Sequence, residues 1–198
     1  LFVGRMMWYK GIRMILDGLV RVKKRGADFR MVFVGSGGEF DEIQACAETL
    51  GLADRCVFVG AVNDREALRA YFCRADLFLF PSSYDTNGIV VHEAAACGLA
   101  SALLRGSAAA EDVTDGVNGL LIDENADSLA ETLLRVTADL PFARALGERA
   151  AGTLYIPWED AVKKACERYR VIVERHKGSP RKPTRILSGR QPRAADLK

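Results

Sequence analysis

Residues 76–98 read DLFLFPSSYDTNGIVVHEAAACG, and this stretch predicts a strand, a loop and a helix in succession. The short apolar run at residues 77–80 is typical of a buried strand, and Pro81 ends it. Residues 82–87 are mostly polar and predict a loop, after which a helix is expected over residues 88–97. Asp85 is therefore expected above the carboxyl edge of a sheet, where α/β folds bind their ligands.

Glu93 is the unusual residue of this predicted helix. The rest of residues 89–97 is nearly all apolar or small, which predicts a helix that is buried on most sides. An ionised carboxylate there costs free energy without a partner, so we expect Glu93 to meet a ligand or a salt bridge. The alternative is that Asp85 only forms a turn and Glu93 is a paired core acid. His92 points about 100° away from Glu93 on the helix and is interpreted as structural.

Apolar strands and amphipathic helices alternate along the whole chain. Strands are predicted at residues 1–3, 30–34, 56–59, 76–80, 100–104 and 119–122. Helices are predicted at residues 11–25, 38–50, 64–74, 88–97, 126–137, 141–152 and 158–175. This alternation predicts an α/β fold: a doubly wound, mostly parallel six-stranded Rossmann-like sheet with helices on both faces, in one domain of residues 1–175.

Charge is divided unevenly along the chain. Residues 176–198 hold seven Lys or Arg and one acid, a net charge of +6, so residues 1–175 carry −4 of the total of +2. A mildly acidic globular part disfavours nucleic-acid binding, which is typical of domains with a basic face. The basic tail, residues 176–198, is predicted to be disordered, either as a solvated extension or in contact with an anionic membrane surface.

Neither the cysteines nor the histidines predict a catalytic or metal centre. No Ser-His-Asp, Cys-His or metal-ligand spacing is present in the sequence. The cysteines form an odd set without a CxxC pair, which favours reduced thiols and a cytoplasmic location, with peripheral contact at the inner face of the membrane left open. The apolar runs are too short to cross a bilayer, and no leader is visible before the first strand, so we expect a piece of a longer protein. The five cysteines are Cys46, Cys56, Cys73, Cys97 and Cys166.

Two cations follow the first predicted strand. Arg5 and Lys10 flank a loop, GRMMWYKG, that leads into a helix. Arg binds phosphate with a planar fork, Lys adds a point charge, and the amides at a helix N-terminus favour anions. The loop therefore predicts a diphosphate site, with solvated surface charges as the alternative.

The loops after the next three strands offer backbone groups. Gly35 and Gly37 would let amides approach a ligand, although a plain tight turn explains them equally well. Residues 60–62 suit the edge of a nucleobase, and the two residues after them, Asn63 and Asp64, suit a helix cap. The amides that open the helix of the fourth loop, candidates for phosphate or sugar oxygens, are those of Asn87, Gly88 and Ile89.

Taken in order, these segments resemble the retaining glycosyltransferases of the GT4 family, which have the GT-B fold. The family's motifs VGR with KG, VGxG, FxG, E-x7-E and DGxNGxL are similar to residues 3–11, 32–37, 58–60, 85–98 and 115–121. A final helix near Trp158 resembles the one that packs back toward the family's other domain. The resemblance runs from residue 1 to about residue 174, and the order of its segments makes it specific.

The resemblance implies a role for each matching residue. Arg5 and Lys10 would bind the diphosphate and stabilise charge on the leaving nucleotide. Glu93 would hold the ribose hydroxyls, and Asp85 would face the donor sugar. The donor would be a UDP- or GDP-sugar, and the transfer would need neither a metal nor a cofactor. The other donor-binding positions implied are Gly4, Gly35, Gly37, Gly60, Ala61, Val62, Asn87, Gly88, Ile89 and Val90.

Two departures from the family limit this expectation. Asp85 stands where the family has Glu, which shortens its reach toward a sugar by one methylene. We expect the family's N-terminal acceptor domain, the partner of this one, to be absent from this chain. We therefore expect the donor-binding half of a hexosyltransferase for an envelope glycan, capsule or glycolipid, which binds nucleotide weakly and transfers no sugar alone. The alternatives are a non-catalytic nucleotide-binding regulatory module and a membrane adaptor acting through the basic tail.

Overall fold

A computed structural model of the chain describes residues 1–85 and 88–177. It divides the chain into two compact units, Leu1–Tyr155 and Ile156–Lys198. The first unit ends before the boundary predicted at residue 175. The assignment of residues 1–175 to donor binding stays a prediction.

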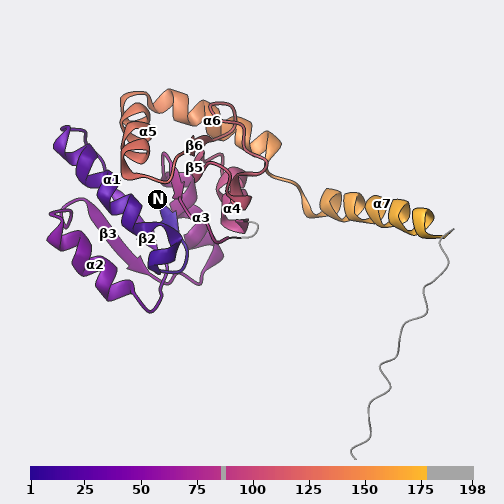
Figure 1. Ribbon diagram of the computed structural model, residues 1–198, viewed down its shortest axis with the longest axis horizontal. Helices are drawn as coiled ribbons and strands as arrows, with labels where there is room; N and C mark the ends of the chain where they lie inside the picture. Colours follow the sequence, from indigo (N-terminus) through magenta and orange to yellow (C-terminus); the bar gives the residue numbers. More distant parts are fainter. Residues whose placement is uncertain (86–87, 178–198) are drawn as a thin grey trace, which may run out of the picture. The chain divides into compact units, whose positions relative to one another are not determined.

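Parallel strands form the centre of the first unit (Figure 1). Within the described residues the strands are β1 (Phe2–Val3), β2 (Met31–Val34), β3 (Cys56–Gly60), β4 (Phe78–Phe80), β5 (Ser101–Leu104) and β6 (Leu120–Ile122). They pair in the orders β1-β2-β3 and β4-β5-β6. Leu1 joins the two halves, because its carbonyl accepts from Leu79 N–H at 2.8 Å and its amino group donates to Leu77 O at 2.9 Å. The predicted doubly wound parallel sheet is confirmed.

Helices follow these strands along the chain, and each begins and ends within two residues of its predicted bounds. They are α1 (Ile12–Lys24), α2 (Phe40–Thr49), α3 (Arg65–Arg74), α4 (Ile89–Ala96), α5 (Ala126–Ala138) and α6 (Leu140–Thr153). α1 packs against α5, and α4 packs against α6. Two short 3₁₀ helices, η1 (Trp8–Lys10) and η2 (Ala108–Ala110), were not predicted, because three residues are too few to show a periodic pattern.

Apolar periodicity explains how α1 packs. Its buried side chains recur at the spacing of one helical face, and Gly18 on this face allows close approach to α5. A Cβ atom at Gly18 would lie 3.0 Å from Leu129 of α5. The close packing on α5 fixes α1, and α1 in turn anchors the end of the loop that precedes it, which is the loop of Arg5 and Lys10.

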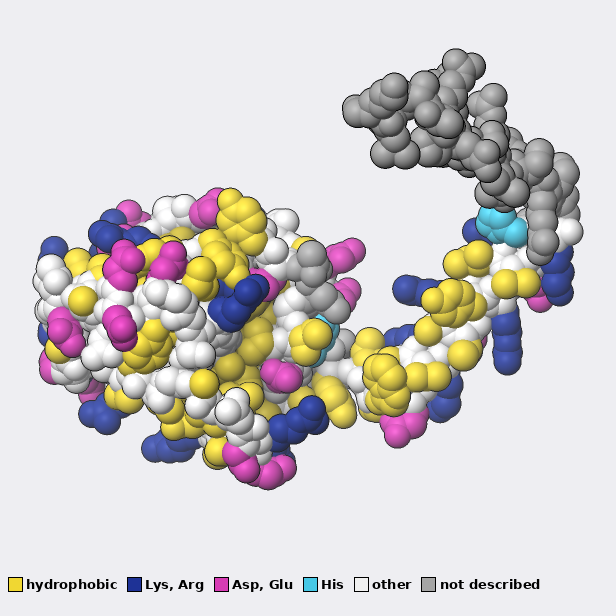
Figure 2. Space-filling model, turned by 90° about the horizontal axis from the view of Figure 1, so that it is seen from below, with side chains coloured by type: hydrophobic (Ala, Val, Ile, Leu, Met, Phe, Trp, Pro, Cys, Tyr) yellow, Lys and Arg dark blue, Asp and Glu magenta, His cyan; other side chains and the backbone are white. Residues whose placement is uncertain are grey.

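The second unit contains α7 (Trp158–His176), in which no residue is buried. Figure 2 shows hydrophobic side chains along this helix with Lys and Arg beside them. The exposed apolar side chains include Trp158, Val162, Tyr169, Ile172 and Val173. None of the helices in residues 1–85 and 88–177 is long and apolar enough to span a membrane. Most of the predicted tail, residues 178–198, lies outside the described residues, so membrane contact stays a prediction.

Candidate functional site

Backbone hydrogen bonds hold together the loops that follow β1, β2 and β3. Gly4 N–H donates to Val34 O at 3.0 Å, and Met6 N–H donates to Ser36 O at 3.0 Å. The loop after β2 is joined in turn to the end of β3, because its first amide, on Gly35, donates to a carbonyl there at 2.8 Å. The carboxyl ends of β1, β2 and β3 are therefore connected to one another.

Close backbone contact explains two glycines of this edge. Gly35 has φ +138°, and a Cβ atom there would lie 1.8 Å from Gly4 O. A Cβ atom at Gly37 would lie 2.4 Å from Met6 O. The tight-turn alternative is sufficient for both glycines, because no other residue would leave room for the neighbouring loop. Their part in ligand binding stays a prediction.

Lys10 is buried at the end of η1. Only 7% of the residue is exposed, and its Nζ atom lies 2.5 Å from Asp85 Oδ1. The ammonium also lies 5.3 Å from the ring centre of Tyr9 and 5.8 Å from that of Phe80, which are cation–π distances. The alternative of a solvated surface charge is therefore wrong for Lys10.

Asp85 and Ser82 each carry a buried polar atom that has no hydrogen-bond partner among the described residues. These atoms are Asp85 Oδ2 and Ser82 Oγ. Burial of the carboxyl group acts to raise its pKa, but Lys10, the nearby Ser82 hydroxyl and Arg5 together hold the pKa of Asp85 below its ordinary value. Such atoms call for a hydroxyl or a water. Sequence reasoning missed Ser82, although a small polar residue directly after a buried strand and a proline was the available signal.

The contribution of Asp85 to stability is expected to depend on pH. Because its folded pKa lies below the ordinary 3.8, the charged carboxylate stabilises the fold above that pH, and the stabilisation is lost as the pH falls through the folded pKa. The difference in free energy of unfolding between the wild type and Asp85→Asn should be constant from about pH 5 to 7 and shrink below about pH 4 in urea titrations. A difference that grows toward low pH would contradict this assignment of charge.

Gly11 fixes the loop of Lys10 against the loop of Asp85. It has φ +76°, in the left-handed region that favours glycine, and it ends η1. A Cβ atom at Gly11 would lie 2.0 Å from Pro81 O. The distance between the two loops is therefore set by the absence of a side chain at this position.

Arg5 lies on the same loop but is exposed. Its guanidinium lies 5.9 Å from the ring centre of Tyr9, the ring that also meets Lys10. Its charge also contributes to the lowered pKa of Asp85. The structure therefore brings together three of the four predicted catalytic residues.

Glu93, the fourth, is exposed, and the expectation of burial was wrong. Val91, Ala94 and Ala95 form the buried side of α4, whereas Ile89 and Ala96 are exposed with Glu93. An apolar composition did not show which side faces the core, because alanine is tolerated on either side. No ion pair within the described residues involves Glu93, so its carboxylate is free to meet a ligand.

The residues around Glu93 have structural contacts. His92 Nδ1 lies 2.9 Å from Leu154 O, in agreement with its interpretation as a structural histidine. Gly88 precedes α4 with φ +55°, and a Cβ atom there would lie 2.8 Å from the Cβ atom of Ala109. Asn87 lies outside the described residues, and Val90 is half-buried on α4.

The loop after β3 is open at its surface. Gly60 has φ +81° with no atom near the position of a Cβ, Ala61 is exposed and Val62 is half-buried. Asp64 caps α3, because its Oδ1 atom accepts from Ala67 N–H at 2.7 Å. Of the two predicted caps, Asp64 is thus the correct one, and the proposed base contact of residues 60–62 stays a prediction.

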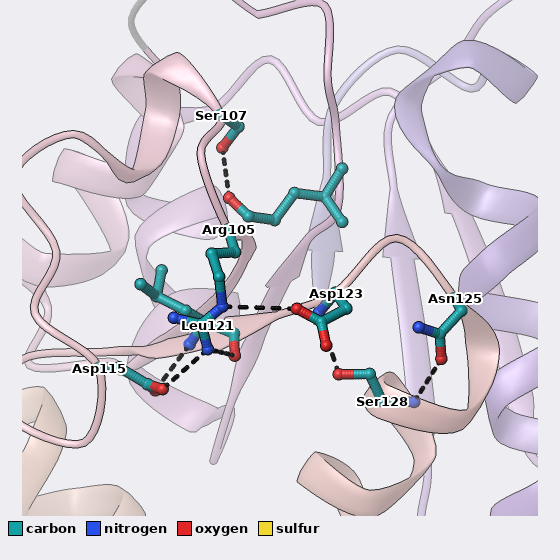
Figure 3. A network of polar contacts seen from close by, with 8 residues as sticks. Arg105, Ser107, Asp115, Leu121, Asp123, Asn125 and Ser128 are labelled. Carbon is teal, nitrogen blue, oxygen red and sulfur yellow. Dashed lines mark hydrogen bonds and ion pairs between the residues drawn. The ribbon is translucent and has the colours of Figure 1, made fainter.

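The DGVNG segment at residues 115–119 has a structural role. Figure 3 shows Asp115 beside Arg105, whose Nη2 atom donates to Asp115 Oδ2 at 3.1 Å. The other carboxylate oxygen, Oδ1, accepts from Leu121 N–H at 2.9 Å. Asn118 is 5% exposed, and its Oδ1 atom accepts from Thr114 N–H at 2.7 Å. The segment closes its own turn and supports β6.

Burial makes two cysteine thiols poor nucleophiles. It raises the pKa of Cys56 to about 12 and that of Cys97 to about 11. All five cysteines of the chain are free thiols. Because the thiolate is the reactive form of cysteine, these raised pKa values disfavour a nucleophilic role for Cys56 and Cys97.

Solved structures share this fold. Sucrose-phosphate synthase from Thermosynechococcus elongatus matches with a TM-score of 0.76 and 27% identity, over 88% of this chain and 46% of that one. The C-terminal domain of a glycosyl transferase group 1 protein from Francisella tularensis matches with a TM-score of 0.69 over 77% of this chain and 82% of that one, and at 19% identity this likeness shows the fold alone. The class is the C-terminal domain of GT-B glycosyltransferases, as the sequence predicted.

Sequence relatives point to the same class. A GDP-mannose-dependent alpha-(1-6)-phosphatidylinositol monomannoside mannosyltransferase of Mycolicibacterium smegmatis is 31% identical over 73% of this chain and 40% of its own length. The pattern of the family glycosyl transferases group 1 matches residues 1–153, and the chain belongs to this family. It spans between 35% and 45% of the length of the first curated relatives that it matches.

Proposed function

We propose that the Leu1–Tyr155 unit binds the nucleoside diphosphate part of a nucleotide-sugar donor. The observation that carries the proposal is the buried ammonium of Lys10, held 2.5 Å from Asp85 at the carboxyl edge of the sheet in a member of this family. The Lys10 ammonium has three N–H donors, and among the described residues Asp85 is the one hydrogen-bond acceptor that it meets. A diphosphate would supply a second acceptor and would also meet the exposed Arg5.

The arrangement suits the departure of a nucleoside diphosphate. Negative charge develops on the leaving phosphate when the bond to the sugar breaks, and fixed positive groups stabilise that charge without moving. Lys10 is fixed by its two aromatic neighbours and by Asp85. Arg5 is free to form the planar two-point contact that phosphate oxygens favour. This chemistry requires neither a general acid nor a metal.

Asp85 and Ser82 face the donor sugar in this proposal. Their buried atoms without partners, Asp85 Oδ2 and Ser82 Oγ, would pair with sugar hydroxyls. Base and sugar identity are chosen by the open loop at residues 60–62 and by the exposed end of α4.

Within a longer protein, the unit would be the donor-binding half of a retaining glycosyltransferase. The name of the Mycolicibacterium smegmatis relative, a GDP-mannose-dependent enzyme acting on a phosphatidylinositol mannoside, supports a nucleotide-sugar donor and a glycolipid acceptor. The acceptor class we propose is an envelope glycan, capsule or glycolipid. A regulatory module without transfer activity would keep the nucleotide site, so only transfer by the longer protein separates the two.

Glu93 is expected to hold the ribose of the bound nucleotide. Calorimetric titration of the chain with UDP, GDP and ADP identifies the preferred nucleotide, and Glu93→Gln should weaken its binding by about 10- to 30-fold, as loss of charge-assisted hydrogen bonds does. A nucleotide that lacks the ribose 2′-hydroxyl should lose affinity for the wild type but little for Glu93→Gln.

Glu48→Gln is the matched control, because Glu48 is likewise an exposed glutamate on a helix of this unit. It should leave binding unchanged. If none of the three nucleotides bound at millimolar concentration, the donor-site proposal would be wrong. If Glu93→Gln weakened binding of the nucleotide with the ribose 2′-hydroxyl and of the nucleotide without it by the same factor, the ribose assignment would be wrong. The diphosphate site would still stand.

A further inference from the structure

Glu39 stands at the N-terminus of α2, and its side chain makes no capping bond to that helix. Ser, Thr, Asp and Asn are the residues favoured at this position, because their short side chains reach the first amides of their own helix. The longer Glu side chain extends away to the neighbouring loop. Capping of α2 therefore does not explain the presence of Glu39 at this position.

The carboxylate of Glu39 instead serves η1. Its Oε2 atom accepts from Trp8 N–H at 2.5 Å, and Trp8 is the first residue of η1. The residue before η1, Met7, makes no side-chain capping bond. A helix N-terminus has unpaired amides and a partial positive charge, both of which a carboxylate satisfies. Glu39 thus caps a helix that belongs to a different loop.

Two more contacts fix the same place. The backbone N–H of Glu39 donates to Met6 O at 3.3 Å, so Glu39 holds the loop on both sides of Met7. The indole Nε1 of Trp8 donates to Glu42 Oε1 at 3.0 Å. The start of η1 is therefore bound to α2 at three points.

The end of η1 carries the cation of the site. Lys10 N–H donates to Met7 O at 3.0 Å, so its backbone follows the turn that begins at Trp8. Its side chain then reaches Asp85. A rotation of this single turn would move the ammonium away from Asp85, because a three-residue helix has no second turn to keep its direction.

We propose that Glu39 is a positioning residue, whose carboxylate holds η1 so that Lys10 and Arg5 face the diphosphate of the donor. The proposal rests on the donor site described above. It adds a residue outside the loops of the two cations and of Asp85, and assigns it to the placement of charge rather than to contact with the ligand.

The first test needs no nucleotide. The pKa of the Asp85 carboxyl group is measured by NMR in the wild type, Glu39→Ala, Glu39→Gln and Glu48→Ala. In Glu39→Ala the ammonium of Lys10 is released, so the pKa of Asp85 should rise toward its ordinary value. Removal of a negative charge by itself would lower that pKa, so a rise reports the loss of position.

Glu39→Gln is the rescue variant. Its amide oxygen still accepts from Trp8 N–H, so the pKa of Asp85 should not rise, and Glu48→Ala should behave as the wild type. An unchanged Asp85 pKa in a folded Glu39→Ala protein would overturn the proposal. So would an equal rise in Glu39→Ala and Glu48→Ala.

The second test uses nucleotides as probes. Glu39→Ala should weaken binding of UDP or GDP about tenfold, and binding of UMP or GMP less than about threefold, because the cations face the second phosphate. Equal losses for diphosphate and monophosphate would contradict the proposal. A further outcome is that the wild type binds neither nucleotide while the pKa of Asp85 still rises in Glu39→Ala. That result would show that the donor-site proposal is wrong and that the positioning role of Glu39 is correct.

Discussion

Replacement of Lys10 by Met is expected to weaken the binding of UDP or GDP by about 100-fold, the effect of losing hydrogen bonds to a charged group. Met keeps the length and flexibility of the Lys stem and removes only the charge and the donors. The ammonium is 2.5 Å from Asp85 and lies against two aromatic rings, so no solvent charge replaces it. Calorimetry with the nucleoside diphosphate measures the loss directly.

The same variant should also lower the free energy of unfolding by about 2 kcal/mol, because the partly buried Asp85 is left without its partner. The double variant Lys10→Met with Asp85→Asn removes both charges. It should recover most of the stability and none of the diphosphate affinity. Stability and binding are thereby separated in one set of proteins.

Lys23→Met is the matched control for this pair. Lys23 also meets an aspartate, Asp54, at 2.7 Å, but the Lys23 side chain is 38% exposed and that of Asp54 is 61% exposed. Lys23→Met should lower the free energy of unfolding by less than about 1 kcal/mol and leave nucleotide binding unchanged. Normal diphosphate affinity in Lys10→Met would show that Lys10 is a structural ion pair and no phosphate ligand.

Replacement of Gly11 by Ala is expected to lower the free energy of unfolding by more than about 3 kcal/mol. The new Cβ atom would lie 2.0 Å from Pro81 O, and φ is +76°. Relief requires the loop of Lys10 and the loop of Asp85 to separate, so protein that still folds should also bind diphosphate more weakly. Urea unfolding followed by circular dichroism measures the change in stability.

Gly26→Ala is the control that measures the backbone strain alone, without a steric clash. Gly26 has φ +77°, and no atom lies within 4 Å of the position of its Cβ. Its substitution should cost only about 1 kcal/mol, the ordinary penalty of a left-handed residue. Equal losses in the two variants would show that the contact between Gly11 and Pro81 relaxes without cost.

The candidate site was predicted in its parts but not in its contacts. The loops predict roles for Arg5, Lys10 and Asp85; Lys10 pairs with Asp85, and both cations lie near the ring of Tyr9. The sequence predicts a buried Glu93, and the residue is exposed. The difference has a physical cause, since a run of small apolar residues is compatible with either side of a helix facing the core.

Glu39 shows the other limit of sequence reasoning. Its position before α2 resembles that of an ordinary cap, and only the structure shows its carboxylate at Trp8 of another loop. The loops meet because Gly35 and Gly37 let the backbone of the loop after β1 approach closely. Such a contact has no pattern of its own along the chain.

The sequence by itself determined the alternation of strands and helices, and hence the parallel sheet and the edge where its loops gather, because periodicity and turn residues act over a few neighbouring positions. The tertiary structure alone decided which side chains meet there. Lys10 and Asp85 are 75 positions apart, and their ion pair depends on the adjacency of β1 and β4 and on the missing side chain of Gly11. Contacts of this kind are fixed by packing over the whole sheet, which no local pattern records.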